Sequence, residues 1–146
     1  MTQTLILSYK AENEFDGELC ATVEGGGFRG QGAAWFSLDE LHSFCAALGQ
    51  YPIPKTPPTL NGGYWSGDGG ACSQIHMGLT VAPYDIRGNL LVSVQLSEPS
   101  LEFDGHDLHR SVSAQFCTDY PSLERFRASF LAVLASEAET AILQGQ

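Results

Sequence analysis

Residues 28–41 read FRGQGAAWFSLDEL, and this stretch turns a strand directly into a helix. Its first nine residues predict a strand that ends in two bulky aromatic side chains. Ser37 and Glu40 then stand three positions apart in front of an apolar run. This is the spacing of a capping box, in which the serine hydroxyl accepts from the third helical amide and the glutamate accepts from the serine amide. The stretch therefore predicts a helix over residues 37–48.

This helix has one apolar face. Its apolar residues recur at spacings of three and four, which is the period of a helix that buries a single stripe. These residues are Leu38, Leu41, Phe44, Cys45 and Leu48. Gly49 follows, at the position where a glycine in the left-handed conformation often ends a helix. We expect the stripe to face a sheet and the helix to end in such a cap.

Three strands are expected up to this helix. Residues 4–9 and 18–24 alternate apolar and polar side chains, which is typical of strands with one buried face. The run Gly25-Gly26-Gly27 separates the second strand from the third, and glycine enters positive φ angles freely. The first 36 residues therefore predict a three-stranded antiparallel meander.

The rest of the chain is expected to repeat this order. Prolines 52, 54, 57 and 58 predict an extended connector over residues 51–61, because proline cannot donate to a central strand. Glycine-rich residues 61–70 predict a surface loop that holds at most a short strand at Tyr64 and Trp65. The remaining elements are expected as strands at residues 74–81, 90–96 and 108–118, a hairpin turn at residues 85–89, and a helix at residues 121–141 whose buried stripe runs from Leu123 to Ala138.

These elements predict a single α+β domain over residues 1–146. Its antiparallel β-sheet has about six to seven strands in βββα-βββα order, with two helices packed against it. A chain of this length can bury a substantial core. Apolar residues make up 43% of the chain and charged residues 16%, which excludes the disordered class with its low hydrophobicity and high charge content.

The chain is strongly acidic. Seventeen acidic residues against seven basic ones give a net charge of −10, which disfavours nucleic acid and anionic membranes and favours a basic protein partner. Between Lys10 and Arg29 the acidic residues have no base among them, and the same holds between Arg87 and Arg110. We expect these two acidic segments to steer the partner.

The cysteines and the N-terminus indicate a cytoplasmic protein. Four cysteines stand far apart without a CxxC pair, and they are expected to be free thiols. The first residues lack the basic segment and long apolar run of a signal peptide. No apolar run approaches the ~20 residues that cross a bilayer. A cytoplasmic location is the expectation that joins these features.

No catalytic, metal or cofactor site is predicted. His106 and His109 lie where a loop enters a strand, so their side chains need not converge on a metal ion. Cys72, Ser73 and His76 lie along one extended strand, where side chains point to alternating faces or lie too far apart to act as nucleophile and base. The glycine-rich residues 25–32 lead into a strand, whereas a phosphate-binding loop leads into a helix. An enzyme is therefore disfavoured, and we expect no cofactor.

Binding residues are predicted in two loops. Tyr64 and Trp65 are large aromatic residues in a glycine-rich loop, and aromatic side chains often dominate binding energy. The predicted set adds the neighbouring Asp68 and His76 and, from the second acidic segment, Glu102, Asp104 and Asp107.

The strand and capped helix of residues 30–41 resemble a pattern found in small bacterial immunity proteins, including the wall-associated-toxin immunity family. That resemblance implies a non-catalytic protein that binds and neutralises a partner protein. Two alternatives stay open. One is a small enzyme or ligand-binding domain with a pocket near Trp65 and His76, and the other is a self-associating module that forms a homodimer through its sheet edges.

Overall fold

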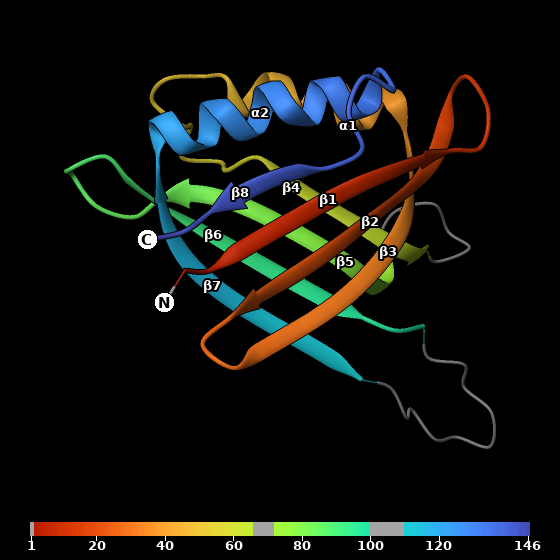
Figure 1. The fold of residues 1–146 in the computed structure, drawn as a ribbon, viewed down its shortest axis with the longest axis horizontal. Helices are drawn as coiled ribbons and strands as arrows, with labels where there is room; N and C mark the ends of the chain where they lie inside the picture. The colour runs from red at the N-terminus through yellow and green to blue at the C-terminus, as the bar shows by residue number, and fades with distance from the viewer. Residues whose placement is uncertain (1, 66–71, 100–109) are drawn as a thin grey trace.

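The computed structural model describes residues 2–65, 72–99 and 110–146. These residues form two helices and eight strands, which are divided between two four-stranded antiparallel sheets (Figure 1). The α+β class, the antiparallel pairing and the two helices are confirmed. The single sheet of six to seven strands is wrong, because the two runs of strands pair among themselves and not with each other.

Sheet A has the strand order β3-β2-β1-β8. Its strands are β1 (Thr4–Ala11), β2 (Asp16–Gly25), β3 (Phe28–Ser37) and β8 (Ala141–Gln144). The first three form the expected meander, and the turn between β2 and β3 places Gly26 and Gly27 at φ angles of 60° and 87°. The last strand reaches β1 from the far end of the chain, with Leu143 opposite Leu5.

Sheet B has the strand order β4-β5-β6-β7, so each of its strands pairs with its neighbour in sequence. The strands are β4 (Thr59–Trp65), β5 (Cys72–Pro83), β6 (Asn89–Ser97) and β7 (Ser111–Asp119). The first of these differs from the connector and loop predicted up to residue 70, in which at most a short strand at Tyr64 and Trp65 was expected. Leu60 and Gly62 face the core there, so this edge strand is longer than its glycines suggested.

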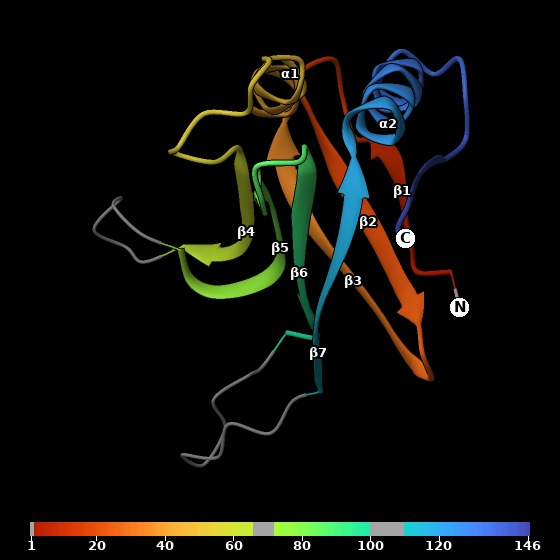
Figure 2. The same cartoon turned by 90° about the vertical axis from the view of Figure 1, so that its left-hand side faces the viewer.

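The two helices lie side by side at one end of the sheets (Figure 2). They are α1 (Leu38–Leu48) and α2 (Tyr120–Leu134). The capping box is confirmed, because the Glu40 amide donates to Ser37 Oγ over 3.1 Å and the Ser37 amide donates to Glu40 Oε1 over 3.4 Å. Asp119 caps α2 by accepting from the Ser122 amide over 2.7 Å. The N-terminus of each helix is thereby capped by the last residue of the strand that precedes it.

One hydrophobic core joins the sheets and the helices. The expected stripe of α1 is buried from Leu41 to Leu48, and its Phe44 ring lies 6.4 Å from the Phe130 ring of α2. Each helix contacts strands of both sheets: α1 contacts β3 and β4, and α2 contacts β1, β7 and β8. The helices therefore tie the two sheets together.

Strand β3 approaches sheet B closely because its inward residues are small. A Cβ atom added to Gly30 would lie 2.6 Å from Val112 Cβ, and one added to Gly32 would lie 2.7 Å from the His76 carbonyl oxygen. From the other side, a Cβ atom on Gly62 would lie 2.6 Å from the Phe36 ring. Glycine at these three positions lets the backbone of one sheet come into direct contact with atoms of the other.

The second helix is shorter than predicted. It ends at Leu134 instead of residue 141, and Ala138 is exposed. Ser136 takes a φ of 60°, which reverses the chain and brings Ala141 and Leu143 into the core as part of β8. Gly49 also departs from expectation, because it ends α1 with a φ of −81° and not in the left-handed conformation.

None of the helices in the described ranges is both long and apolar enough to cross a membrane. All four cysteines are free, and Cys45 is buried in the core.

We predict that Gly32→Ala destabilises the protein by about 1–3 kcal/mol, because the new methyl group would press on the backbone of β5. Ala33→Val adds bulk one residue along but on the outer face of β3, and it should change stability by less than about 0.5 kcal/mol. Urea unfolding followed by circular dichroism measures both. Equal stability of Gly32→Ala and the wild type would refute the role assigned to this close contact.

Candidate functional site

Two of the predicted binding residues, Tyr64 and His76, lie together. Their rings meet edge to face with centroids 4.6 Å apart. The pairing of β4 with β5 is irregular here, with shifts at Gly62/Gly63 and Tyr64/Trp65. Gly63 has a φ of 156°, and a Cβ atom there would collide with the Gln74 carbonyl oxygen. This irregularity requires glycine at position 63.

His76 is a buried, neutral histidine and not an open ligand-binding group. Its side chain is 4% exposed, and Nε2 hydrogen-bonds Gln74 Oε1. Burial lowers the pKa of His76 from its ordinary value of 6.5, because the charged ring would lose its hydration. Trp65 is 54% exposed at the end of β4. Among the described residues, His76 therefore offers no accessible imidazole to a pocket near Trp65.

The nucleophilic side chains near His76 are engaged elsewhere. Cys72 Sγ donates to the Gln74 carbonyl over 3.3 Å, and Ser73 Oγ donates to the Tyr64 carbonyl over 3.1 Å. Burial raises the pKa of Cys45 to about 11, which keeps that thiol protonated at neutral pH. These contacts assemble no nucleophile with a base in residues 2–65, 72–99 and 110–146.

Several predicted residues lie outside the described residues. They are Asp68, Glu102, Asp104, Asp107, His106 and His109. Within the described part of the chain, no group of three or more histidine, cysteine, aspartate or glutamate side chains is arranged to hold a metal ion.

The acidic segments are partly neutralised by arginines at their ends. Glu24 forms an ion pair with Arg29 over 3.3 Å. Glu98 accepts from the Arg110 guanidinium through both carboxylate oxygens, over 3.0 Å to Oε2 and 3.2 Å to Oε1. These two glutamates are therefore paired with the arginines that flank their segments. Glu24 lies opposite Arg29 in the β2–β3 pair, and Glu98 lies opposite Arg110 where the pairing of β6 with β7 ends.

Three exposed acidic residues lie near an exposed tryptophan at one corner of sheet A. The turn between β1 and β2 and the junction between β3 and α1 enclose a surface hollow of about 460 Å³. Its lining residues are Glu12, Asn13, Asp16, Trp35, Phe36, Ser37 and Glu40, and we call this region the acidic corner. No lysine or arginine contributes to this lining among the residues that the structure describes.

The backbone of the acidic corner is held by short hydrogen bonds. Asn13 Oδ1 accepts from the amides of Phe15 and Asp16 over 2.8 and 3.0 Å, which closes the turn. The Leu38 amide donates to the Phe15 carbonyl over 2.7 Å, which fastens that turn to the start of α1. The three carboxylates and the indole are therefore presented by two elements that support each other.

One exposed aromatic residue lines this corner and a second lies beside it. Trp35 is 56% exposed on the outer face of β3, and Phe15 is 71% exposed at the tip of the turn. The acidic segment was predicted from the sequence, whereas Trp35 was predicted only as the end of a strand. Strand alternation could have found it, because Phe36 faces the core and its neighbour must then face outward.

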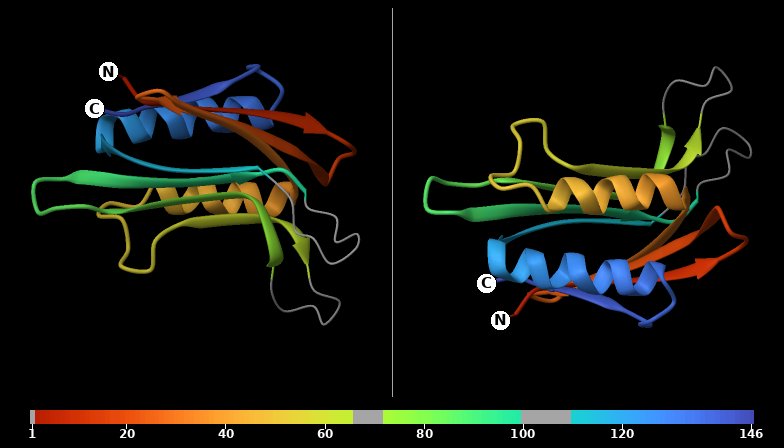
Figure 3. Two further views of the ribbon diagram at one scale, coloured as in Figure 1. Left: turned by 90° about the horizontal axis from the view of Figure 1, so that it is seen from below. Right: turned by 90° about the horizontal axis from the view of Figure 1, so that it is seen from above.

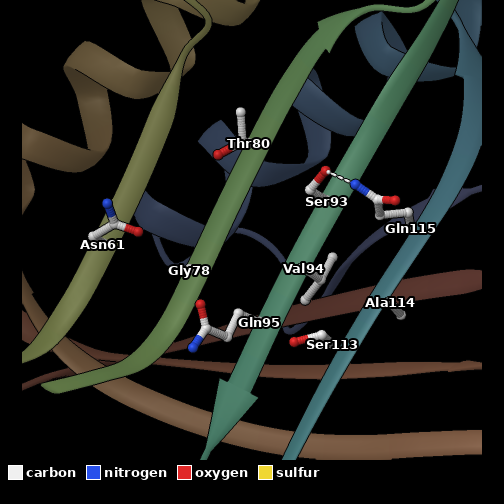
Figure 4. Close-up of a pocket in the computed structure, with 9 residues that line it drawn as sticks. All are labelled: Asn61, Gly78, Thr80, Ser93, Val94, Gln95, Ser113, Ala114 and Gln115. Carbon is white, nitrogen blue, oxygen red and sulfur yellow. Dashed lines mark hydrogen bonds between the residues drawn. The ribbon is translucent and has the colours of Figure 1, made fainter.

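A second hollow, of about 380 Å³, lies on the outer face of sheet B (Figure 4). Its lining residues are uncharged and mostly polar, and they come from all four strands of that sheet. Figure 3 places the β1–β2 turn, which forms the acidic corner, at the opposite end of the molecule from the β5–β6 hairpin.

The fold and its surface define a two-sheet α+β protein with shallow polar hollows, without a converged catalytic group in the described residues. In comparisons with known proteins, the chain matches no family model, no curated protein and no solved structure.

We predict that His76 makes the protein less stable in mild acid. Below pH of about 6.5 the unfolded chain takes up a proton that the folded chain excludes, so the free energy of unfolding falls until the pH reaches the lowered pKa. His76→Gln should therefore lose less stability than the wild type between pH of about 7.5 and about 5.5. Urea midpoints at both pH values measure this, and the same substitution at exposed His42 is the control. Identical pH dependence in His76→Gln and the wild type would contradict the prediction.

Proposed function

We propose that this chain is a non-catalytic binding protein that captures a basic protein partner at the acidic corner. The observation that carries the proposal is the hollow of about 460 Å³ lined by Glu12, Asp16, Glu40 and Trp35. An arginine or lysine side chain of the partner is the group that this lining fits best. The resemblance to bacterial immunity proteins supports the same class of function, in which the partner is a toxin.

The chemistry of the corner favours a cation in two ways. Its carboxylates attract positive charge, and the face of a tryptophan ring attracts cations through its quadrupole, by about 0.5–1 kcal/mol at exposed sites. Arginine suits such a place best, because its planar group can stack on the indole while it donates to carboxylates. Trp35 therefore gives the corner a preference that an acidic cluster alone would lack.

The corner also meets the usual requirements of a binding hot spot. Its backbone is already fixed by the Asn13 and Leu38 hydrogen bonds, so little conformational entropy is lost on binding. Trp35 and Phe15 offer exposed aromatic area, and such residues carry much of the energy in protein interfaces. The net charge of −10 would speed the encounter with a basic partner.

The proposal is tested with a hexa-arginine peptide as a model of the partner's basic surface. The chain has two tryptophans, Trp35 and Trp65, so its NMR spectrum contains two indole N–H resonances. The Trp35 resonance is assigned from its absence in the Trp35→Phe variant. It should shift as peptide is added until the shift saturates, whereas the Trp65 resonance should not move. Raising the salt from about 50 mM to about 500 mM should weaken this binding, because exposed charges are screened.

A matched pair of variants separates the corner from the general charge of the protein. Glu12→Gln with Asp16→Asn removes two carboxylates of the hollow and should weaken peptide binding roughly three- to tenfold. Glu137→Gln with Glu139→Gln removes two exposed carboxylates between α2 and β8 and should have little effect. Equal losses in both variants, or a shift of Trp65 instead of Trp35, would rule out the corner as the binding site.

A further inference from the structure

The four strands of sheet B are almost free of charge. Apart from the buried His76, the only acidic or basic residue within their bounds is Asp119, the last residue of β7. The strands of sheet A, by contrast, carry Lys10, Asp16, Glu18, Glu24 and Arg29. In a protein with a net charge of −10, an extended neutral sheet face requires an explanation.

The outward side chains of sheet B form rows across the strands. Asn61, Gly78, Gln95 and Ser113 are aligned in one row. Thr59, Thr80, Ser93 and Gln115 are aligned in the next. Together these rows line most of the hollow of about 380 Å³ that Figure 4 shows, and we call this surface the neutral face.

Part of the hydrogen-bonding capacity of the neutral face is unused. Gln115 Nε2 donates to Ser93 Oγ over 3.0 Å, and the hydroxyls of Thr59 and Thr80 lie 3.4 Å apart. The side chains of Asn61, Gln95 and Ser113 make no hydrogen bond to another residue of the described ranges. Beyond these rows, half-buried Ala82, Leu91 and Cys117 form an adjoining apolar row.

We propose that the neutral face binds the same face of a second copy of this chain. In a two-fold dimer each surface meets itself, so the surface must be complementary to itself. Amide and hydroxyl side chains satisfy this condition, because each carries both a donor and an acceptor. A charged surface fails it, because identical charges would meet across the two-fold axis.

Charge also selects this face over the others. Two copies that each carry a charge of −10 repel one another, and the repulsion is strongest where acidic side chains approach closely. The acidic corner and the outer face of sheet A place carboxylates in any such contact. The neutral face keeps the strands of both copies free of like charges at the point of contact.

The size of the face predicts a weak dimer. Four strands about 4.8 Å apart, each exposed over about seven residues, give a flat area of roughly 450 Å² per copy. A typical stable interface buries about 800 Å² on each partner. We therefore expect an equilibrium between monomer and dimer that depends on protein concentration.

Sedimentation equilibrium of the whole chain tests this proposal. Between about 5 µM and about 500 µM protein, the average mass should rise from the 15.7 kDa of one chain toward twice that value. A mass that stays at one chain over the whole range would overturn the proposal.

A pair of isosteric double variants tests whether the neutral face makes the contact. Gln95→Glu with Gln115→Glu places four carboxylates in the dimer interface and should raise the dissociation constant at least tenfold. Gln31→Glu with Gln144→Glu adds the same charge to exposed glutamines of sheet A, and it should raise that constant less than threefold. Both Gln31 and Gln144 lie on the outer face, since Leu143 and Gly32 beside them face inward.

The variants decide the proposal in every case. Equal weakening by both double variants, or no weakening by the first, would overturn it and place the association elsewhere. Recovery of the Gln95→Glu, Gln115→Glu dimer in about 500 mM salt would support it, because salt screens the added repulsion but does not refold an unfolded chain. If the dimer does not recover and the folded circular dichroism spectrum is lost, the double variant is unfolded. The test then uses Ser113→Asp, which must also raise the dissociation constant at least tenfold.

Discussion

The contact between β3 and sheet B is the constraint on which the rest of the structure depends. This strand is hydrogen-bonded into sheet A, yet its inward backbone at Gly30 and Gly32 touches Val112 and the His76 carbonyl of sheet B. Stacked sheets normally lie about 10 Å apart, with side chains between them. Where β3 meets sheet B, glycine leaves no side chains between the sheets. The rest of the space between the sheets is filled by the helices, whose Phe44 and Phe130 rings pack against each other.

Local signals account for the elements that the sequence predicted correctly. The capping box at Ser37 fixes the start of α1 through contacts three residues apart, and Gly26 provides a conformation that few other residues adopt. Strand β8 carries no comparable signal. Its four residues become a strand only because β1 offers a free edge, where Leu143 faces Leu5. The division into two sheets likewise depends on long-range pairing, which alternation of apolar residues cannot specify.

The candidate site was predictable in its charge but not in its shape. The acidic turn can be predicted from the sequence. The hollow, in contrast, exists because the Leu38 amide donates to the Phe15 carbonyl and so holds that turn against α1. Exposure of Trp35 follows from the orientation of one strand. Tyr64 and His76 were predicted together and do meet, but the irregular pairing at Gly63 buries the histidine. The ion pairs of Glu24 and Glu98 also required the fold, since each arginine approaches across paired strands or a loop.

The separation of charge between the two sheets has a consequence for both proposals. The acidic corner belongs to sheet A and α1, and the neutral face belongs to the outer side of sheet B, so the two surfaces share no residue. One copy could therefore pair with a second while both corners remain open to a basic partner. Such a dimer would present two cation-binding corners on one rigid body. A partner with two basic surfaces at matching distance would then bind more tightly than either corner alone allows, because the second contact forms at a high effective concentration.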